Sequence, residues 1–392
     1  MFPHQTNMLK KLHRFLSIAI LVVHQNCVTP YSINAVEIEG ETLAVEGDII
    51  VGGDTKIYLS LLAKLDIYDA TFITDALVWV ESTQGEIYTG MLVDEENTQP
   101  CFLIDTKSLS LDKGYKLCIH LPNGRVYESD FLTPLHTPEI GSIDFAINEA
   151  HTAVEFFVTT SGDLDSSPYY RWSYTEDWEI TSTYRVSYYY DPILNMVVAY
   201  PYHPNNTYTY YCWGKARSTS ILIARTDHLL ENLVHRQKLN TIYEVDNRIS
   251  NLYSMELYQI SISKEAYTYW STLEKHTSEM GTIFAPQLDW LNGNIRCVSD
   301  PDVKVIGYIS AGTLSVQRIF VDALEMQVYI HDYDKCPQVT PPRGATYRDM
   351  VAMGYQIFFA DQPVWWTPVY CVDCRSAGGT KNKPSFWPNT HI

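Results

Sequence analysis

Short runs that alternate between apolar and polar residues, separated by turn residues, fill the chain from about residue 36 to residue 135. The run from Leu43 to Leu61 alternates on both sides of Gly52–Gly53–Asp54, and Ala76–Ser82 alternates as well. Alternation of period two puts apolar side chains on one face of a β-strand. Strands at this close spacing predict an immunoglobulin-like β-sandwich over residues 36–135.

The clearest turn of this first region follows the alternating run Tyr115–Leu121. The tripeptide Pro122–Asn123–Gly124 separates it from Arg125–Val126–Tyr127. Asn-Gly between alternating apolar residues is a strong hairpin signal. Two Thr-Pro pairs at residues 133–138 then read as a linker.

Residues 139–340 are predicted to form a second, larger β-rich domain with one or two inserted helices. Its first strands lie in Ile143–Thr160, and Asn292–Gly293 predicts another hairpin. The remaining residues, 341–392, are rich in proline and predict an extended tail. The chain as a whole is therefore expected to be mainly β.

One segment of the second domain, at residues 263–280, follows the helical period instead. Ser263 is a suitable N-cap, and Glu265 lies where the helix dipole favours a negative charge. The apolar residues recur at helical spacing. These are Ala266, Tyr269, Trp270 and Leu273.

The N-terminus has the pattern of a secretory signal over residues 1–26. Three basic residues precede Phe15–Val23, an apolar run that is too short for a membrane span of ~20 residues. Cys27 follows this run closely, which predicts a lipoprotein acylated on Cys27, with residues 27–35 as the linker to the first domain. The alternative is a secreted protein whose Cys27 is free or disulfide-bonded.

Composition favours a folded, acidic protein. Hydrophobic residues make up 46% of the 392 residues, and the formal net charge is -18. An acidic surface repels phosphate backbones, so we expect no nucleic-acid partner.

Tyrosine is unusually frequent, with 29 Tyr against 13 Phe, and it is concentrated between Tyr169 and Trp213. Aromatic rings pack well on strands, and they also anchor binding surfaces. The possible binding surface within this stretch consists of Arg171, Trp172, Trp178, Tyr188, Tyr189 and Tyr190. Arg171 is expected either to bind a ligand or to form a structural ion pair, with Glu176 and Asp177 as candidate partners.

The segment CVDCRSAGGTKNKPSFW near the C-terminus contains a C-x-x-C pair, Cys371 and Cys374. A structural zinc site needs four ligands, and the chain has no second C-x-x-C pair. A redox dithiol opens a helix, whereas glycines and a proline follow this pair. Export favours disulfides, and we expect Cys336 to pair with Cys371 or Cys374.

No catalytic, cofactor-binding or metal-ligating residues are assigned from the sequence. Asp163 and Asp165 have a spacing that suits calcium, but they lack the glycine and distal glutamate of an EF-hand loop and read as a solvated loop. The chain also has no H-E-x-x-H, G-x-S-x-G or phosphate-loop motif.

Several longer stretches resemble a known family. They are YYRWSYTEDWEI, YCWGKARSTSILIARTDHL, ISKEAYTYWSTLEKHTSEMGTIFAPQ, GNIRCVSDPDVKVIGYISA and the C-terminal segment quoted above. They are similar to a Bacteroidota lipoprotein family known as a domain of unknown function, number four-two-four-nine. The resemblance implies an outer-membrane lipoprotein, often encoded beside a TonB-dependent transporter. It also implies Cys27 as the lipid site, and Cys212, Cys336, Cys371 and Cys374 as family-type cysteines and disulfide candidates.

The expected function is that of a lipid-anchored accessory protein, without catalysis, that binds a TonB-dependent nutrient transporter or its substrate. Two other classes compete with it. One is a cell-surface hydrolase of glycans or peptides, for which glycan cleavage would need two carboxylates that converge in a cleft. A structural envelope protein would show a surface without a pocket or an apolar patch.

Overall fold

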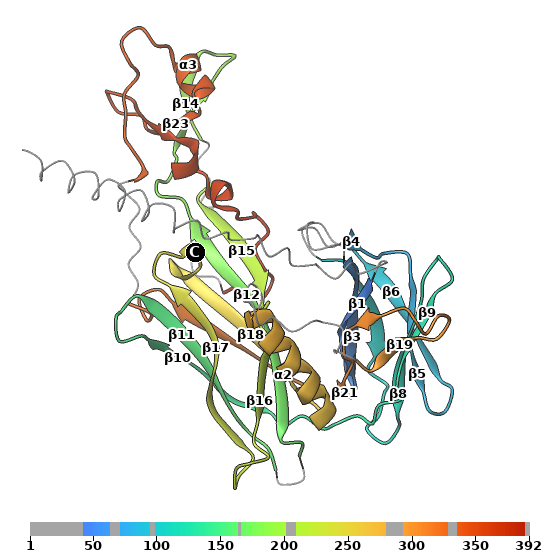
Figure 1. The fold of residues 1–392 in the computed structure, drawn as a ribbon. Coiled ribbons are helices and arrows are strands. Elements are labelled where there is room, and N and C mark those ends of the chain that lie inside the picture. Colours follow the sequence, from blue (N-terminus) through green and yellow to red (C-terminus); the bar gives the residue numbers. More distant parts are fainter. Residues whose placement is uncertain are drawn as a thin grey trace, which may run out of the picture.

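The computed structural model describes residues 42–62, 71–94, 99–163, 166–200, 209–279, 293–327 and 335–388. Within these ranges the chain is mainly β, which confirms the predicted fold class, and the two α-helices are α2 (Lys264–Glu279) and α3 (Tyr347–Ala352) (Figure 1). None of the helices among these residues has the length and apolar character needed to cross a bilayer. Residues 1–26, Cys27 and the linker 27–35 lie outside the described ranges.

The first part of the chain forms one sheet of ten strands that curls back on itself. Its strands are β1 (Thr42–Gly47), β3 (Gly53–Leu62), β4 (Thr71–Phe72), β5 (Leu77–Ser82), β6 (Ile87–Val93), β7 (Cys101–Thr106), β8 (Tyr115–His120), β9 (Val126–Ser129), β19 (Ile295–Cys297) and β20 (Val305–Ile306). The predicted hairpin joins β8 to β9, with Gly124 at a φ of 86° that a glycine adopts without strain.

The curl of this sheet occurs within β6, which changes partners along its length. Ile87–Thr89 pair with β5, and Gly90–Val93 pair with β7. At the change, a Cβ on Gly90 would lie 3.0 Å from Cγ1 of Ile104 and 3.1 Å from the carbonyl oxygen of Val78. A glycine therefore lets the two halves of the sheet approach each other here.

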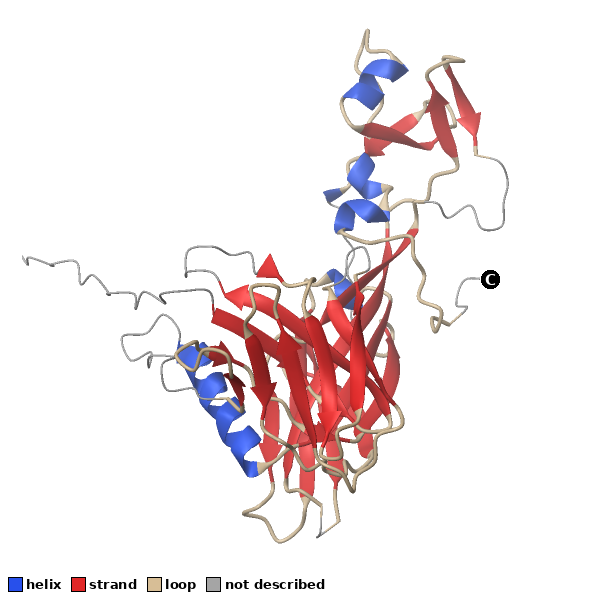
Figure 2. Ribbon diagram, turned by 90° about the vertical axis from the view of Figure 1, so that its right-hand side faces the viewer, coloured by secondary structure: helices blue, strands red, loops and turns tan. Residues whose placement is uncertain are grey.

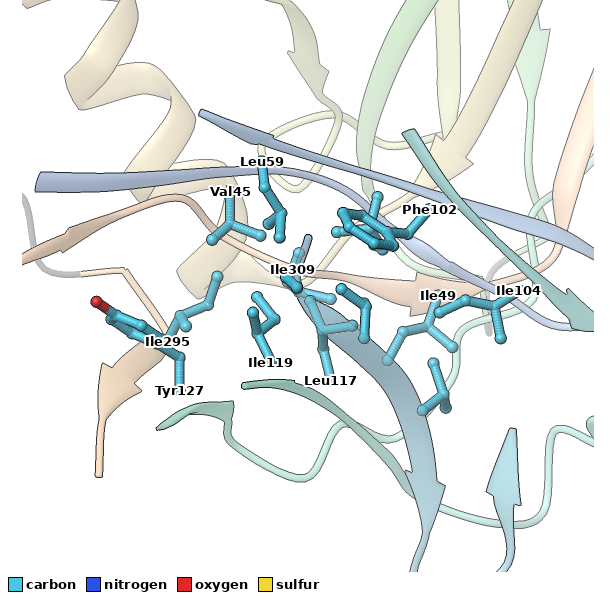
Figure 3. Packing of buried hydrophobic residues seen from close by; sticks show 14 of the residues in the cluster. Val45, Ile49, Leu59, Phe102, Ile104, Leu117, Ile119, Tyr127, Ile295 and Ile309 are labelled. Carbon is cyan, nitrogen blue, oxygen red and sulfur yellow. The ribbon is translucent and has the colours of Figure 1, made fainter. Parts of the chain in front are cut away.

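The core of the first sheet lies between these two halves, as Figure 3 shows. Val45, Leu59 and Phe102 face Leu117 and Ile119 across it, and all five are buried. Each strand contributes alternate residues, which is why the period-two pattern was readable in the sequence. The immunoglobulin-like topology itself stays a prediction, because two packed layers do not define it.

Three short strands from much later in the chain complete this first sheet region. β19 pairs with β9, β20 pairs with β1, and β21 (Ala311–Gly312) pairs with β2 (Ile49–Ile50). The sequence predicts residues 295–312 to belong to the 139–340 domain, yet Ile295 and Ile309 are buried in the core of the first sheet. Strands of two or three residues are too short to show a period, so only the folded chain reveals this return. Asn292 of the predicted second hairpin lies outside the described residues.

The second part of the chain packs a three-stranded sheet on a five-stranded sheet (Figure 2). The smaller sheet consists of β10 (Ile140–Ile147), β11 (Ala153–Ser161) and β17 (Leu233–Tyr243). The larger consists of β12 (Tyr169–Thr181), β15 (Tyr211–Arg217), β16 (Leu222–Arg225), β18 (Leu252–Ser261) and β22 (Leu314–Asp322). Aromatic side chains fill the space between them, with the rings of Phe156 and Tyr253 5.0 Å apart.

Helix α2 is inserted between β18 and β22 and begins where the sequence predicts. The Ser263 hydroxyl accepts a hydrogen bond from the backbone N–H of Ala266 at 3.1 Å. Ala266 and Tyr269 are buried on one face of the helix. That face packs against β12 and against Tyr308 of the returning segment, so α2 lies between the two sheet regions (Figure 1).

A charged contact joins the first sheet region to the second. Arg171 of β12 forms a salt bridge with Asp48, which lies between β1 and β2, and the Arg171 guanidinium stacks over the ring of Trp270 at 4.5 Å. Asp48 also accepts a hydrogen bond from the backbone N–H of Ser310 at 3.2 Å. Burial raises the pKa of Asp48 to about 6, although the attraction of Arg171 opposes this shift.

The raised pKa of Asp48 predicts a pH dependence of stability. A carboxyl whose pKa is higher in the folded chain than its ordinary value of 3.8 stabilises the fold fully below that value. This contribution is lost as pH rises through 6. Relative to Asp48→Asn, the wild-type protein should therefore lose roughly 2–3 kcal/mol of unfolding free energy between pH 4 and pH 7. Urea unfolding followed by tryptophan fluorescence measures it. Parallel pH curves for the two proteins would show that folding does not shift the pKa of Asp48.

Candidate functional site

Two disulfides organise the C-terminal part of the chain. Cys336 pairs with Cys371, and Cys212 of β15 pairs with Cys374, with a Cα–Cα distance of 5.6 Å in each bond. This distance lies within the usual range for a disulfide. The two cysteines of the C-x-x-C pair thus have different partners and do not form a dithiol with each other. The residues described by the structure contain no cluster of His, Cys, Asp or Glu that could hold a metal ion.

The other cysteines of the described chain are buried within the first sheet region. They are Cys101, Cys118 and Cys297. Burial raises the pKa of Cys118 to about 12, so its sulfur stays a protonated thiol at neutral pH. Cys118 therefore serves as a small packing residue of β8.

After the second disulfide, the chain runs back along the larger sheet. Thr380 and Trp213 exchange backbone hydrogen bonds of 2.9 and 2.8 Å. Gly379 fits closely here, because a Cβ on it would lie 2.5 Å from Cβ of Cys212. Further on, Trp387 is buried, and the ring of Phe386 covers the guanidinium of Arg318 at 3.6 Å. The tail predicted as extended is therefore packed through residue 388.

The two disulfides support a small module that stands away from the sheets, which we call the tip module (Figure 2). It consists of residues 184–200 and 336–371. Its elements are β13 (Tyr188–Asp191), β14 (Met196–Ala199), α3, β23 (Tyr355–Phe359), β24 (Trp365–Pro368) and η4 (Val369–Cys371). It has its own core, formed by Tyr190, Met350, Ile357 and Trp366.

The outer end of the tip module exposes apolar side chains on a well-ordered turn. Ile193 and Leu194, between β13 and β14, are 91% and 61% exposed. The Asp191 carboxylate accepts hydrogen bonds from the backbone N–H groups of both residues, at 2.8 and 3.0 Å. The Tyr190 hydroxyl donates to the Asn195 side chain at 2.7 Å. The turn is thus held by local hydrogen bonds while its apolar side chains point into solvent.

Helix α3 lies against this turn and adds to the apolar surface. A capping box between Thr346 and Asp349 fixes the start of the helix. Arg348 donates a hydrogen bond to the carbonyl oxygen of Pro192 at 3.2 Å, which links the helix to the turn. Val351 and Met353, at the end of the helix, are exposed.

The two tryptophans and the arginine of the predicted binding surface all make contacts within the fold. Arg171 pairs with Asp48, rather than with Glu176 or Asp177, and stacks on Trp270. Trp172 is buried and donates to the Gln259 side chain at 2.8 Å. Trp178 is half-buried and packs on Cys212 and Cys374. β12 runs through the middle of a sheet, so every second residue of it points into a core.

The tyrosines of the predicted surface lie on β13 of the tip module. Tyr190 is buried in the module's core, and Tyr188 is half-buried against it. Tyr189 packs on the ring of Tyr200 at 4.9 Å. A binding role for these tyrosines stays a prediction, and the most exposed apolar residues of this segment lie in the turn that follows. A turn of Asp-Pro-Ile-Leu-Asn, with two large apolar residues between turn formers, is the signal that locates them.

The acidic residues of β12 are paired and point in alternate directions. Glu176 accepts hydrogen bonds from Tyr253 at 2.5 Å, Asn240 at 2.8 Å and Arg248 at 2.9 Å. Asp177, on the opposite face, pairs with Arg318 at 3.2 Å. Neighbouring residues of a strand point to opposite faces, so these two carboxylates do not converge on one substrate. Asp163 lies on an exposed loop, and Asp165 lies outside the described residues.

A second candidate site is an open pocket of about 190 Å³ on the outer face of α2. It lies where α2 meets the first residue of β12 and the last residue of β16. The residues that line it are Tyr169, Arg225, Lys264, Tyr267, Thr268, Ser271, Thr272 and Lys275. Cations, hydroxyls and tyrosine rings can together bind a small polar anion.

Comparison with known families places the chain. A family model described as Domain of unknown function (DUF4249) matches residues 28–318. The chain belongs to this family. A search of curated proteins finds no match to this sequence. The family match begins after Cys27 and ends at residue 318, within β22, so it covers the sheet regions up to that strand, the pocket and Cys212, but not the other three disulfide cysteines.

The Cys212–Cys374 bond predicts a specific effect of its removal. Replacing Cys212 and Cys374 with serine should loosen the segment around Cys374 from β15. The bond joins two residues that are 162 positions apart in the sequence. We expect a loss of roughly 3–5 kcal/mol and faster trypsin cleavage after Arg375. Limited proteolysis with mass spectrometry measures it. Cys118→Ala, which removes a buried thiol but no cross-link, is the control. Equal cleavage rates in the wild-type and double-serine proteins would mean that noncovalent contacts alone hold the tail.

Proposed function

We propose that this protein is an exported, lipid-anchored accessory protein of the outer membrane that binds a partner through its tip module. The observation that carries the proposal is the apolar turn at Ile193 and Leu194. Large apolar side chains at the end of a projecting element, exposed to water, are typical of interaction sites. Because the turn is ordered by its own hydrogen bonds, little conformational entropy is lost when a partner covers it.

The cysteine chemistry supports export. Disulfides persist in oxidising compartments and are rare in the cytosol. The two disulfides of the C-terminal part of the chain are in keeping with the signal-like N-terminus, where a basic segment precedes the short apolar run Phe15–Val23. The resemblance to a Bacteroidota lipoprotein family suggests that the exported protein is acylated at Cys27.

The proposed partner is a TonB-dependent nutrient transporter in the same membrane. The stretch 28–41 between Cys27 and β1 spans at most roughly 50 Å. An anchor on such a tether keeps β1 within that distance of the membrane surface and so holds the folded chain beside a transporter barrel in the same membrane. The transporter itself comes from the family resemblance, and the apolar tip is the surface that we assign to it.

Charge at the tip should break this association without unfolding the protein. We expect Ile193→Asp combined with Leu194→Asp to abolish co-purification of a TonB-dependent barrel from native membranes, because burying two carboxylates in an apolar contact is unfavourable. The same variant should keep the wild-type thermal unfolding midpoint, since both side chains are exposed. Tagged protein, native-membrane extraction and quantitative mass spectrometry give the measurement.

The matched control is Leu230→Asp, because Leu230 is 99% exposed on the loop between β16 and β17, away from the tip module. It should recover the barrel as the wild type does. If the wild-type protein recovers no barrel, or if the tip variant recovers as much as the control, the proposed partner contact is refuted. The N-terminal peptide from the same sample reports whether Cys27 carries lipid.

A further inference from the structure

The pocket on α2 gathers positive charge in an acidic protein. Lys264, Thr268, Ser271 and Lys275 recur at intervals of four, three and four residues, which places them along one face of the helix. Arg225, the last residue of β16, approaches this face from the sheet. The eight lining residues thus include three cations and no carboxylate, although the whole chain has 46 acidic residues against 28 Lys and Arg.

An acidic residue, Asp227, contacts both Tyr169 and Arg225 on one side of the pocket. The Tyr169 hydroxyl donates to Oδ2 of Asp227 at 2.8 Å, and Nε of Arg225 lies 3.5 Å from Oδ1 of the same carboxylate. The hydrogen bond from Tyr169 lowers the pKa of Asp227 and raises the pKa of Tyr169. At neutral pH Asp227 is therefore ionised, Tyr169 stays neutral, and the guanidinium keeps its other N–H donors for a ligand.

Tyrosine rings form the apolar part of the pocket. The rings of Tyr169 and Tyr267 lie 5.3 Å apart, and the guanidinium of Arg225 lies 6.0 Å from the centre of the Tyr267 ring. Hydroxyl groups complete the lining. Thr268 and Thr272 donate their hydroxyl protons to helix carbonyls, at 2.9 and 2.8 Å, so their oxygens remain as acceptors.

Other charges surround the pocket without lining it. The Asp227 carboxylate lies 3.5 Å from Nδ1 of His228 as well as from the Arg225 guanidinium. Glu265 follows Lys264 on the helix. These acids reduce the net charge of the region and are not among the residues that line the pocket. A ligand in the pocket would meet guanidinium and ammonium groups first. Such groups bind carboxylate and phosphate oxygens, with the planar guanidinium able to donate two parallel hydrogen bonds.

From this arrangement we propose that the pocket binds an acidic sugar, meaning a hydroxylated ring that carries a carboxylate or phosphate. Arg225 and Lys264 bind the oxyanion, a tyrosine ring packs against the apolar face of the sugar ring, and the threonine oxygens accept hydrogen bonds from its hydroxyl groups. A volume of about 190 Å³ is suited to one monosaccharide. The site is separate from the tip module, so it stands whether or not the tip binds a transporter.

Isothermal titration calorimetry on the full-length protein in detergent tests this site. The probes are galacturonate, glucose 6-phosphate, neutral glucose and inorganic phosphate, at low and at high salt. We expect both acidic sugars to bind at least about tenfold more tightly than glucose, and more weakly as salt rises. They should also bind more tightly than inorganic phosphate, because phosphate cannot use the tyrosine rings.

Variants assign the binding to the pocket. Arg225→Gln and Lys264→Gln should each weaken the acidic sugars about tenfold or more, the size expected for the loss of a charged hydrogen bond. Tyr267→Leu should weaken the acidic sugars but leave inorganic phosphate unchanged. Lys56→Gln removes an exposed cation on β3, outside the pocket, and should change nothing. All four side chains are at least partly exposed, so unfolding midpoints are expected to stay near that of the wild type.

Several results would overturn the proposal. These are no binding of either acidic sugar, equal binding of glucose, equal binding of inorganic phosphate, or unchanged affinity in Arg225→Gln. A galacturonate trimer distinguishes the two sources of the ligand. Tighter binding of the trimer assigns the pocket to the end of an acidic polysaccharide, and equal binding assigns it to a free sugar acid. The assay uses no transporter, so its outcome is independent of the partner experiment.

Discussion

The arrangement of the sheet regions depends on the excursion of the chain after α2. The chain leaves the larger sheet at β18, pairs with the first sheet through β19 and β20 and with β2 through β21, and returns to the larger sheet as β22. Its buried residue Ile309 sits between the two layers of the first core. Backbone pairing in both sheets therefore ties them together, and α2 and the Arg171–Asp48 salt bridge fill the junction that this path creates.

This junction also explains why the candidate sites lie at the periphery. β12 is the strand richest in aromatic and acidic residues. Its Trp172 and Glu176 are buried and make hydrogen bonds within the fold, so they are not available to a ligand. A buried carboxylate with three donors stabilises the sheet only while all its partners are present. Groups available to a ligand or partner are left where the sheets end, at the tip module and on the solvent face of α2.

The two sites suit different kinds of contact. The tip module is braced by covalent bonds and exposes apolar side chains on an ordered turn, which favours a contact with a macromolecule. The pocket combines an oriented arginine with lysines and tyrosine rings, which favours a small polar anion. A protein that contacts a transporter and also binds an acidic sugar would bring the two together at one membrane.

The sequence by itself determined the β character, the α2 helix with its Ser263 cap, the β8–β9 turn and the cysteines of the tail, because periodicity, capping and turn chemistry are local properties. It also pointed to two partners for Cys336, and the folded chain joins it to Cys371. Only the tertiary structure decided that Cys212 meets Cys374, that Arg171 pairs with Asp48, and that residues 295–312 complete the first sheet. These contacts join residues far apart in the chain, and no local pattern records which distant surface a strand or a charge will meet.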